Sequence, residues 1–132
     1  MSFIENNLKE SSILALLFAG LLVTAPASAA NACDNAYTQT DINKCMAAEL
    51  SVEDGKLNRS YSDLQRLLNA NEKKQLKTAQ RAWIDFRDKA CKFSARSFSG
   101  GSAYSMASNS CLATYTQQRR MQLEEEIKNI KR

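Results

Sequence analysis

Apolar residues recur at alternating steps of three and four along one stretch of the chain, between positions 76 and 93. The series is Leu76, Ala79, Trp83, Phe86, Ala90 and Phe93. This spacing is typical of an amphipathic helix that buries one face against its neighbours. Neither Gly nor Pro interrupts the stretch, and Asn71 followed by Glu72 supplies a capping side chain and an acidic first turn. The pattern predicts a helix whose apolar stripe, with the single Trp, forms the core of the domain.

Two further stretches show helical spacing, one before and one after this helix. Thr38, followed by Asp41, is a suitable N-cap for a helix from Gln39 to about Asn69. Its apolar positions are Ile42, Met46, Leu50, Leu57, Tyr61, Leu64 and Leu68. A third helix is predicted from about Asn109 to Asn129, after a Ser- and Gly-rich loop. Short connections make successive helices antiparallel, and no strand pattern is present. The predicted fold is all-α, a three-helix antiparallel bundle.

The beginning of the chain differs from the rest in composition. Residues 13–23 form an apolar run too short to cross a bilayer comfortably, and Ala27-Ser28-Ala29 follows as a small-residue cleavage site. We interpret residues 1–29 as a signal peptide and residues 30–132 as one helical domain, with no membrane span after cleavage. The protein is therefore expected to be periplasmic or secreted. Without Glu5, Lys9 and Glu10 its formal net charge rises from +4 to +5.

Four cysteines in a small exported domain predict two disulfides. Helix geometry favours pairing Cys33 with Cys45 and Cys91 with Cys111. The segment before the first helix is long enough to fold back along it, and the second helix ends near the start of the third. The alternative joins Cys33 to Cys91 and Cys45 to Cys111 at a shared end of the bundle. Spacing alone does not decide between the two pairings.

The residue types argue against an enzyme. The chain contains no His, which is the commonest general base and a frequent metal ligand. Cysteines held in disulfides do not serve as nucleophiles or metal ligands. Carboxylate pairs one turn apart, such as Glu49 and Glu53, are usually solvated on a long surface helix. We therefore expect no catalysis, no cofactor and no metal site.

Two surfaces are candidates for binding a partner. Aromatic residues flank a glycine pair in the predicted loop, a form suited to entering a partner's groove, although a simple turn between helices is the default explanation of the glycines. The loop residues are Phe98, Ser99, Gly100, Gly101, Ser102 and Tyr104. A basic ridge on the second helix would suit an anionic ligand, although such runs are by default solvated. The ridge consists of Lys73, Lys74, Lys77 and Arg81.

Polar residues beside the apolar stripes are expected to form a cluster at the edge of the core. They are Asn58, Asp88, Thr116 and Arg119. Arg119 falls on the stripe of the third helix, so its guanidinium should pair with a carboxylate of Asp88 or Asp54.

Several short motifs run in order along most of the chain. They are Thr38-Gln39-x-Asp41-x-Asn43-x-Cys45, Leu57-Asn58-x-x-Tyr61, Ala79-Gln80-Arg81-Ala82-Trp83-Ile84-x-Phe86-Arg87-Asp88-x-x-Cys91, Gly100-Gly101-Ser102 and Thr116-x-x-Arg119-x-x-x-Leu123. This pattern resembles the LprI-type lysozyme inhibitor family of exported bacterial proteins. The resemblance implies a small, helical, disulfide-bonded envelope protein with lysozyme as its partner.

Two functional hypotheses follow from these observations. The first is a lysozyme inhibitor that occludes the substrate cleft, with the aromatic loop as the inserted element. The second is a non-enzymatic envelope module for an anionic ligand, such as lipopolysaccharide or a wall polymer. Nucleic acid is disfavoured, because the chain is predicted to be exported and carries no recognisable nucleic-acid motif.

Overall fold

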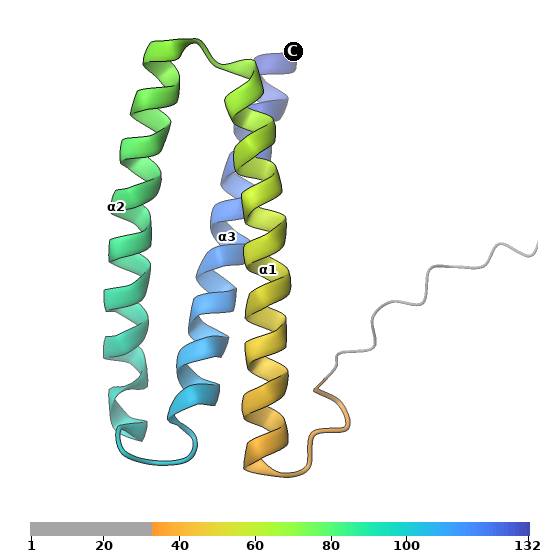
Figure 1. The fold of residues 1–132 in the computed structure, drawn as a ribbon, viewed down its shortest axis with the longest axis vertical. Helices are drawn as coiled ribbons and strands as arrows, with labels where there is room; N and C mark the ends of the chain where they lie inside the picture. The colour runs from red at the N-terminus through yellow and green to blue at the C-terminus, as the bar shows by residue number, and fades with distance from the viewer. Residues whose placement is uncertain (1–32) are drawn as a thin grey trace, which may run out of the picture.

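The computed structural model describes residues 33–132, which fold into three long α-helices and one short 3-10 helix (Figure 1). The elements are α1 (Gln39–Leu67), α2 (Ala70–Ser94), η1 (Ala95–Phe98) and α3 (Tyr104–Lys131). Successive helices are antiparallel, which confirms the predicted all-α bundle. The predicted signal peptide lies outside the described residues. No helix between residues 33 and 132 is long and apolar enough to cross a membrane.

Side-chain caps set the beginnings of the first two helices. The Thr38 hydroxyl accepts a hydrogen bond from the backbone N–H of Asp41 at 3.1 Å, as predicted. The predicted cap of α2, Asn71, is wrong, because Asn69 is the capping residue. The Asn69 side chain accepts from the N–H of Glu72, and the Glu72 carboxylate accepts from the N–H of Asn69 at 2.8 Å. This reciprocal arrangement requires an acid three residues after the cap, which only Asn69 has.

The core lies mainly between α1 and α3, which run in the same direction and pack along most of their length. Its buried residues are Leu57 and Leu64 from α1 and Leu123 from α3. Partly buried side chains surround them: Tyr61, Leu68, Leu76, Trp83 and Ile127. Two helices therefore supply the core, and α2 covers it from one side.

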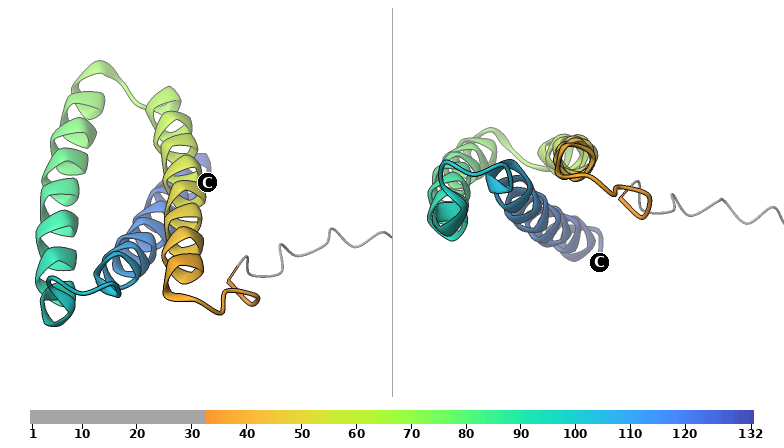
Figure 2. Two further views of the ribbon diagram at one scale, coloured as in Figure 1. Left: turned by 60° about the horizontal axis from the view of Figure 1, so that its bottom comes forward. Right: turned by 90° about the horizontal axis from the view of Figure 1, so that it is seen from below.

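The apolar stripe of α2 is only partly in the core, so the sequence-based prediction is wrong for half of it. Leu76 and Trp83 pack against the core, whereas Phe86 is 56% and Phe93 65% exposed, and Ala79 is exposed. Figure 2 shows that α3 starts beside the C-terminal end of α2 and leans away from it toward its own C-terminus. Helical spacing shows which residues share a face, but not how much of that face a neighbour covers.

The third helix begins at Tyr104, earlier than predicted, and the connection before it is correspondingly short. The first turn of α3 is held against α1. Asn43 donates a hydrogen bond to the carbonyl of Ser102 at 2.9 Å, and the Gln39 amide lies 3.8 Å from the Met106 sulfur. These contacts stabilise a helix start that a Ser-rich sequence does not indicate by itself.

Both disulfides follow the local pairing, so the alternative pairing is wrong. Cys33 is joined to Cys45, with Cα atoms 5.3 Å apart, and Cys91 to Cys111, with Cα atoms 5.5 Å apart. The first bond fastens the segment before α1 to that helix. The second ties the end of α2 to α3, next to the connection between them.

Candidate functional site

The connection from η1 to α3 lies at one end of the bundle, and residues 98–104 are here called the tip loop (Figure 1). Two turns shape it: the N–H of Gly101 donates to the carbonyl of Phe98 at 3.0 Å, and the N–H of Tyr104 donates to the carbonyl of Gly101 at 3.2 Å. Gly100 has a φ of +78°, a conformation that favours glycine. Phe98 is 43% exposed and Tyr104 is partly buried, so the loop is partly exposed.

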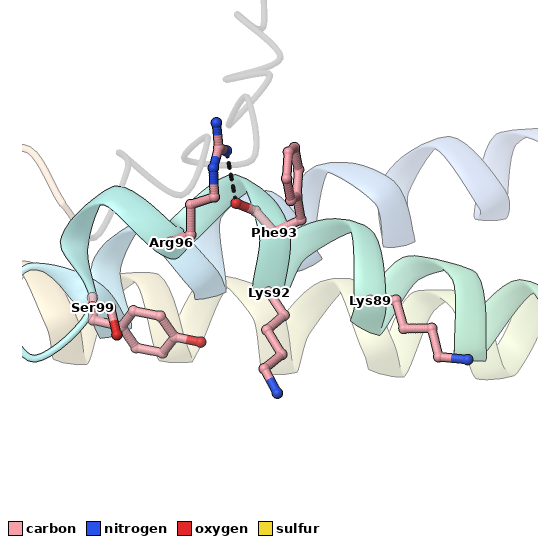
Figure 3. A pocket seen from close by; sticks show the side chains of 6 residues that line it. Lys89, Lys92, Phe93, Arg96 and Ser99 are labelled. Atoms are coloured by element: carbon pink, nitrogen blue, oxygen red, sulfur yellow. Dashed lines mark hydrogen bonds between the residues drawn. The ribbon is translucent and has the colours of Figure 1, made fainter.

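A surface pocket of about 390 Å³ lies between the end of α2 and the tip loop (Figure 3). It is lined by Lys89, Lys92, Phe93, Arg96, Ser99 and Tyr104. Three lining residues are cations, two are aromatic and none is acidic. This pocket was not predicted from the sequence. Lys89 and Lys92 lie one turn apart on α2, and Arg96 follows them on η1.

The cations of this pocket differ in their partners. Lys89 pairs with Asp85 at 2.8 Å, on the same helix. Lys92 and Arg96 have no carboxylate oxygen within 4.0 Å among residues 33–132. The Arg96 guanidinium lies 3.9 Å from the centre of the Phe93 ring and donates to the Phe93 carbonyl at 2.9 Å (Figure 3). The pocket thus has two unpaired cations on its rim, and Figure 3 shows Arg96 beside the exposed Phe93 ring and Lys92 pointing away from them. Both cations suit an anionic group.

The predicted basic ridge lies away from this pocket, in the N-terminal half of α2 (Figure 1). Its four residues, Lys73, Lys74, Lys77 and Arg81, are all exposed. None of them forms an ion pair with a carboxylate of the described chain. The structure therefore places the tip loop and the ridge at different ends of the bundle, as two separate candidate surfaces.

The predicted carboxylate partner of Arg119 is wrong. Its Nε donates to the side-chain oxygen of Gln80 at 3.0 Å, and its Nη1 donates to the side-chain oxygen of Gln122 at 3.1 Å. Partial burial beside α2 lowers the pKa of Arg119, and the nearby Glu126 opposes that shift. Neutral amide oxygens therefore satisfy this guanidinium in place of an acid.

Arg87 occupies the position that was predicted for Arg119. It donates to the hydroxyl of the fully buried Thr116 at 3.1 Å and to Asp88 at 2.9 Å, and it pairs with Asp54 of α1 at 3.4 Å. Its guanidinium also lies 5.1 Å from the centre of the Trp83 ring. Arg87 thereby connects all three helices. The fourth member of the predicted cluster, Asn58, is exposed.

A second polar network, which was not predicted from the sequence, joins α1 to α3. Arg120 donates to Glu124 at 2.9 Å, and the Ser60 hydroxyl donates to the same carboxylate at 3.1 Å. Arg120 also faces Glu53 at 3.5 Å, and Glu53 is only 7% exposed. The hydrogen bond with Arg120 is the main reason why the pKa of Glu124 is lowered, and it raises the pKa of Arg120. This network holds the parallel pair of helices together.

The lowered pKa of Glu124 predicts a loss of stability in acid. The pKa of Glu124 is lower in the folded protein than in the unfolded chain. Ionised Glu124 therefore stabilises the fold at any pH above its unfolded-state pKa. This stabilisation is lost as the pH falls through the folded-state pKa. The side chain is 40% exposed, so the contribution should be at most about 1 kcal/mol. Urea unfolding at pH 7 and at pH 3 should show that Glu124→Gln loses less stability on acidification than the wild type. Glu125→Gln, at a more exposed position of the same helix, should behave like the wild type.

Comparison with known sequences identifies the family. The sequence profile described as "Lysozyme inhibitor LprI" matches residues 29–123. The chain belongs to this family. Among curated relatives, an uncharacterized protein of Rhizobium meliloti is 33% identical over 121 residues, covering 80% of this chain and 87% of its own. The uncharacterized protein YecT of Escherichia coli is 32% identical over 71 residues, covering 43% of this chain and 44% of its own. No solved structure matches the chain.

Within the LprI family match lie both disulfides, the tip loop and the pocket beside it. The description of the family makes a lysozyme the candidate partner of this protein.

Proposed function

We propose that this protein inhibits lysozyme by placing the tip loop in the substrate cleft. The observation that carries the proposal is an exposed aromatic loop held at both of its ends. The Cys91–Cys111 disulfide ties the helices on either side of the loop, and Asn43 holds the carbonyl of Ser102 from α1. A loop held in this way loses little conformational freedom on binding, so more of the contact energy remains as affinity.

Local contacts have to supply the affinity, because net charge does not help. The chain from residue 30 onward carries a formal charge of +5, and animal lysozymes are also basic. Two like-charged proteins repel each other at long range, which slows association at low salt. An aromatic side chain that enters a pocket of the partner is the usual centre of such an interface. Phe98, at the start of the tip loop, is the residue best placed for this role.

Phe98→Ala is expected to weaken inhibition by about tenfold or more, because truncating a central aromatic anchor removes at least ~1–2 kcal/mol of binding free energy. The melting temperature should hardly change, since the side chain is already 43% exposed. The assay is the clearing of a bacterial cell-wall suspension by lysozymes of several types. Leu67→Ala is the matched control, because Leu67 is 39% exposed at the other end of the bundle. If wild-type protein in micromolar excess slows no lysozyme, the proposed function is wrong.

The basic ridge supports a second candidate function, the binding of an anionic envelope ligand. Its exposed, unpaired cations would attract lipopolysaccharide or an acidic wall polymer. Salt distinguishes the two functions. Association with an anionic polymer should weaken steeply as salt is added, whereas association with a basic lysozyme should become faster as the mutual repulsion is screened. A Lys73→Gln, Lys77→Gln double variant should weaken binding of the anionic polymer and leave inhibition of lysozyme unchanged.

A further inference from the structure

We propose that the pocket between α2 and the tip loop receives carboxylates of the lysozyme substrate cleft, with Lys92 and Arg96 as the cations that meet them. This inference rests on the proposed inhibition of lysozyme and assigns the residues that recognise the enzyme. It extends the interface from the tip loop along the end of α2.

The chemistry of the target supplies the first reason. Lysozyme cleaves glycosidic bonds with two carboxyl groups that flank the bond to be broken, and at least one of them is ionised. A basic lysozyme therefore carries local negative charge inside its cleft. A basic inhibitor is therefore electrostatically complementary to the cleft of lysozyme, although it is repelled by most of the remaining lysozyme surface.

The state of the two cations supplies the second reason. Lys92 and Arg96 have no carboxylate partner in residues 33–132, so binding would not have to break an existing ion pair. Arg96 is already positioned by the ring and the carbonyl of Phe93. Its remaining N–H groups are available for the forked hydrogen bonds that a guanidinium makes with a carboxylate.

The position of the pocket supplies the third reason. Ser99 and Tyr104 belong to both the pocket and the tip loop, so a cleft that admits the loop also reaches the pocket. Three arginines of the bundle are engaged with acids of the described chain: Arg66 with Asp63, Arg87 with Asp54, and Arg120 with Glu124. The basic ridge is exposed but lies away from the tip loop (Figure 1). The pocket combines free positive charge, an aromatic surface and contact with the loop.

Neutralising the pocket cations tests the proposal. Arg96→Gln and Lys92→Gln are each expected to raise the inhibition constant about tenfold, as loss of a close interfacial charge pair does. Lys77→Gln, which also removes one positive charge but from the basic ridge on α2, should leave inhibition unchanged or improve it slightly by reducing net repulsion. Circular dichroism melting curves should coincide for all four proteins, since Lys92, Arg96 and Lys77 are exposed.

A lysozyme variant supplies the reciprocal test. Replacing the ionised catalytic carboxylate by its amide should weaken calorimetric binding of the wild-type inhibitor about tenfold, but weaken binding of Arg96→Gln much less. If the wild type inhibits lysozyme while Arg96→Gln and Lys92→Gln match Lys77→Gln, the pocket assignment is wrong and the proposed function stands. If the wild type binds no lysozyme, both are wrong. Equal weakening of wild type and Arg96→Gln by the lysozyme variant would also overturn the assignment.

Discussion

Arg120→Ala should lower the free energy of unfolding by about 3 kcal/mol, because it leaves the buried Glu53 without its partner on α3. The estimate is at the lower end for a broken buried pair, since Lys56 still contacts Glu53 at 2.6 Å. Glu124 would also lose its two 2.9 Å hydrogen bonds from Arg120. Urea unfolding followed by circular dichroism measures the loss.

Two comparisons show whether burial causes this effect. Arg66 pairs with Asp63 on the surface, where the Arg66 side chain is 72% and the Asp63 side chain 52% exposed. Arg66→Ala should therefore lower the free energy of unfolding by less than ~1 kcal/mol. The Glu53→Gln, Arg120→Met double variant removes both charges and leaves neither one buried without a partner. Its loss in free energy of unfolding should be smaller than the sum of the losses of Glu53→Gln and Arg120→Met measured singly. Equal losses for Arg120→Ala and Arg66→Ala would show that the network between α1 and α3 contributes no more than a surface pair.

Helix positions could be read from the sequence because they depend on local chemistry. Thr38 caps α1 through its own hydroxyl, and the three-and-four spacing of apolar residues requires only the geometry of a single helix. The local disulfide pairing was favoured for the same reason, since each bond closes a short loop. Interactions between helices were predicted less well. Whether Arg87 or Arg119 reaches Asp54 depends on how α2 and α3 cross, and the helical period does not contain that information.

The candidate site was also predicted only in part. The tip loop was visible as a glycine pair between aromatic residues, all within a few positions of one another. The pocket beside it was not, because it forms where three segments meet. Tyr104 reaches it because α3 begins earlier than the Ser-rich sequence indicates. The regular apolar stripe of α2 does not predict the exposure of Phe93 either, because the helical period does not show where a neighbouring helix stops covering the stripe.

Removing the Cys91–Cys111 disulfide should both destabilise the protein and abolish inhibition. The bond closes a loop with a sequence separation of 20, for which the chain-entropy relation gives about 3 kcal/mol. Cys91 is the one fully buried residue of α2, so the bond is also the main anchor of that helix on α3. Lys92 and Phe93 follow it directly, and both line the pocket. Cys91→Ser combined with Cys111→Ser avoids a free thiol and should be measured by urea unfolding and by the cell-wall assay.

The other disulfide is the matched control for this prediction. Cys33–Cys45 has a sequence separation of 12, so the same relation gives a similar loss of about 3 kcal/mol. That bond fastens only the segment before α1, and the α2–α3 connection does not depend on it. The Cys33→Ser, Cys45→Ser variant should therefore be destabilised to a similar degree yet still inhibit lysozyme under conditions where it is folded. Loss of inhibition in both variants at equal stability would mean that the arrangement of α2 and the tip loop does not determine inhibition. If the Cys91→Ser, Cys111→Ser variant still inhibits lysozyme, the same conclusion holds, because the tip loop would then function without the disulfide.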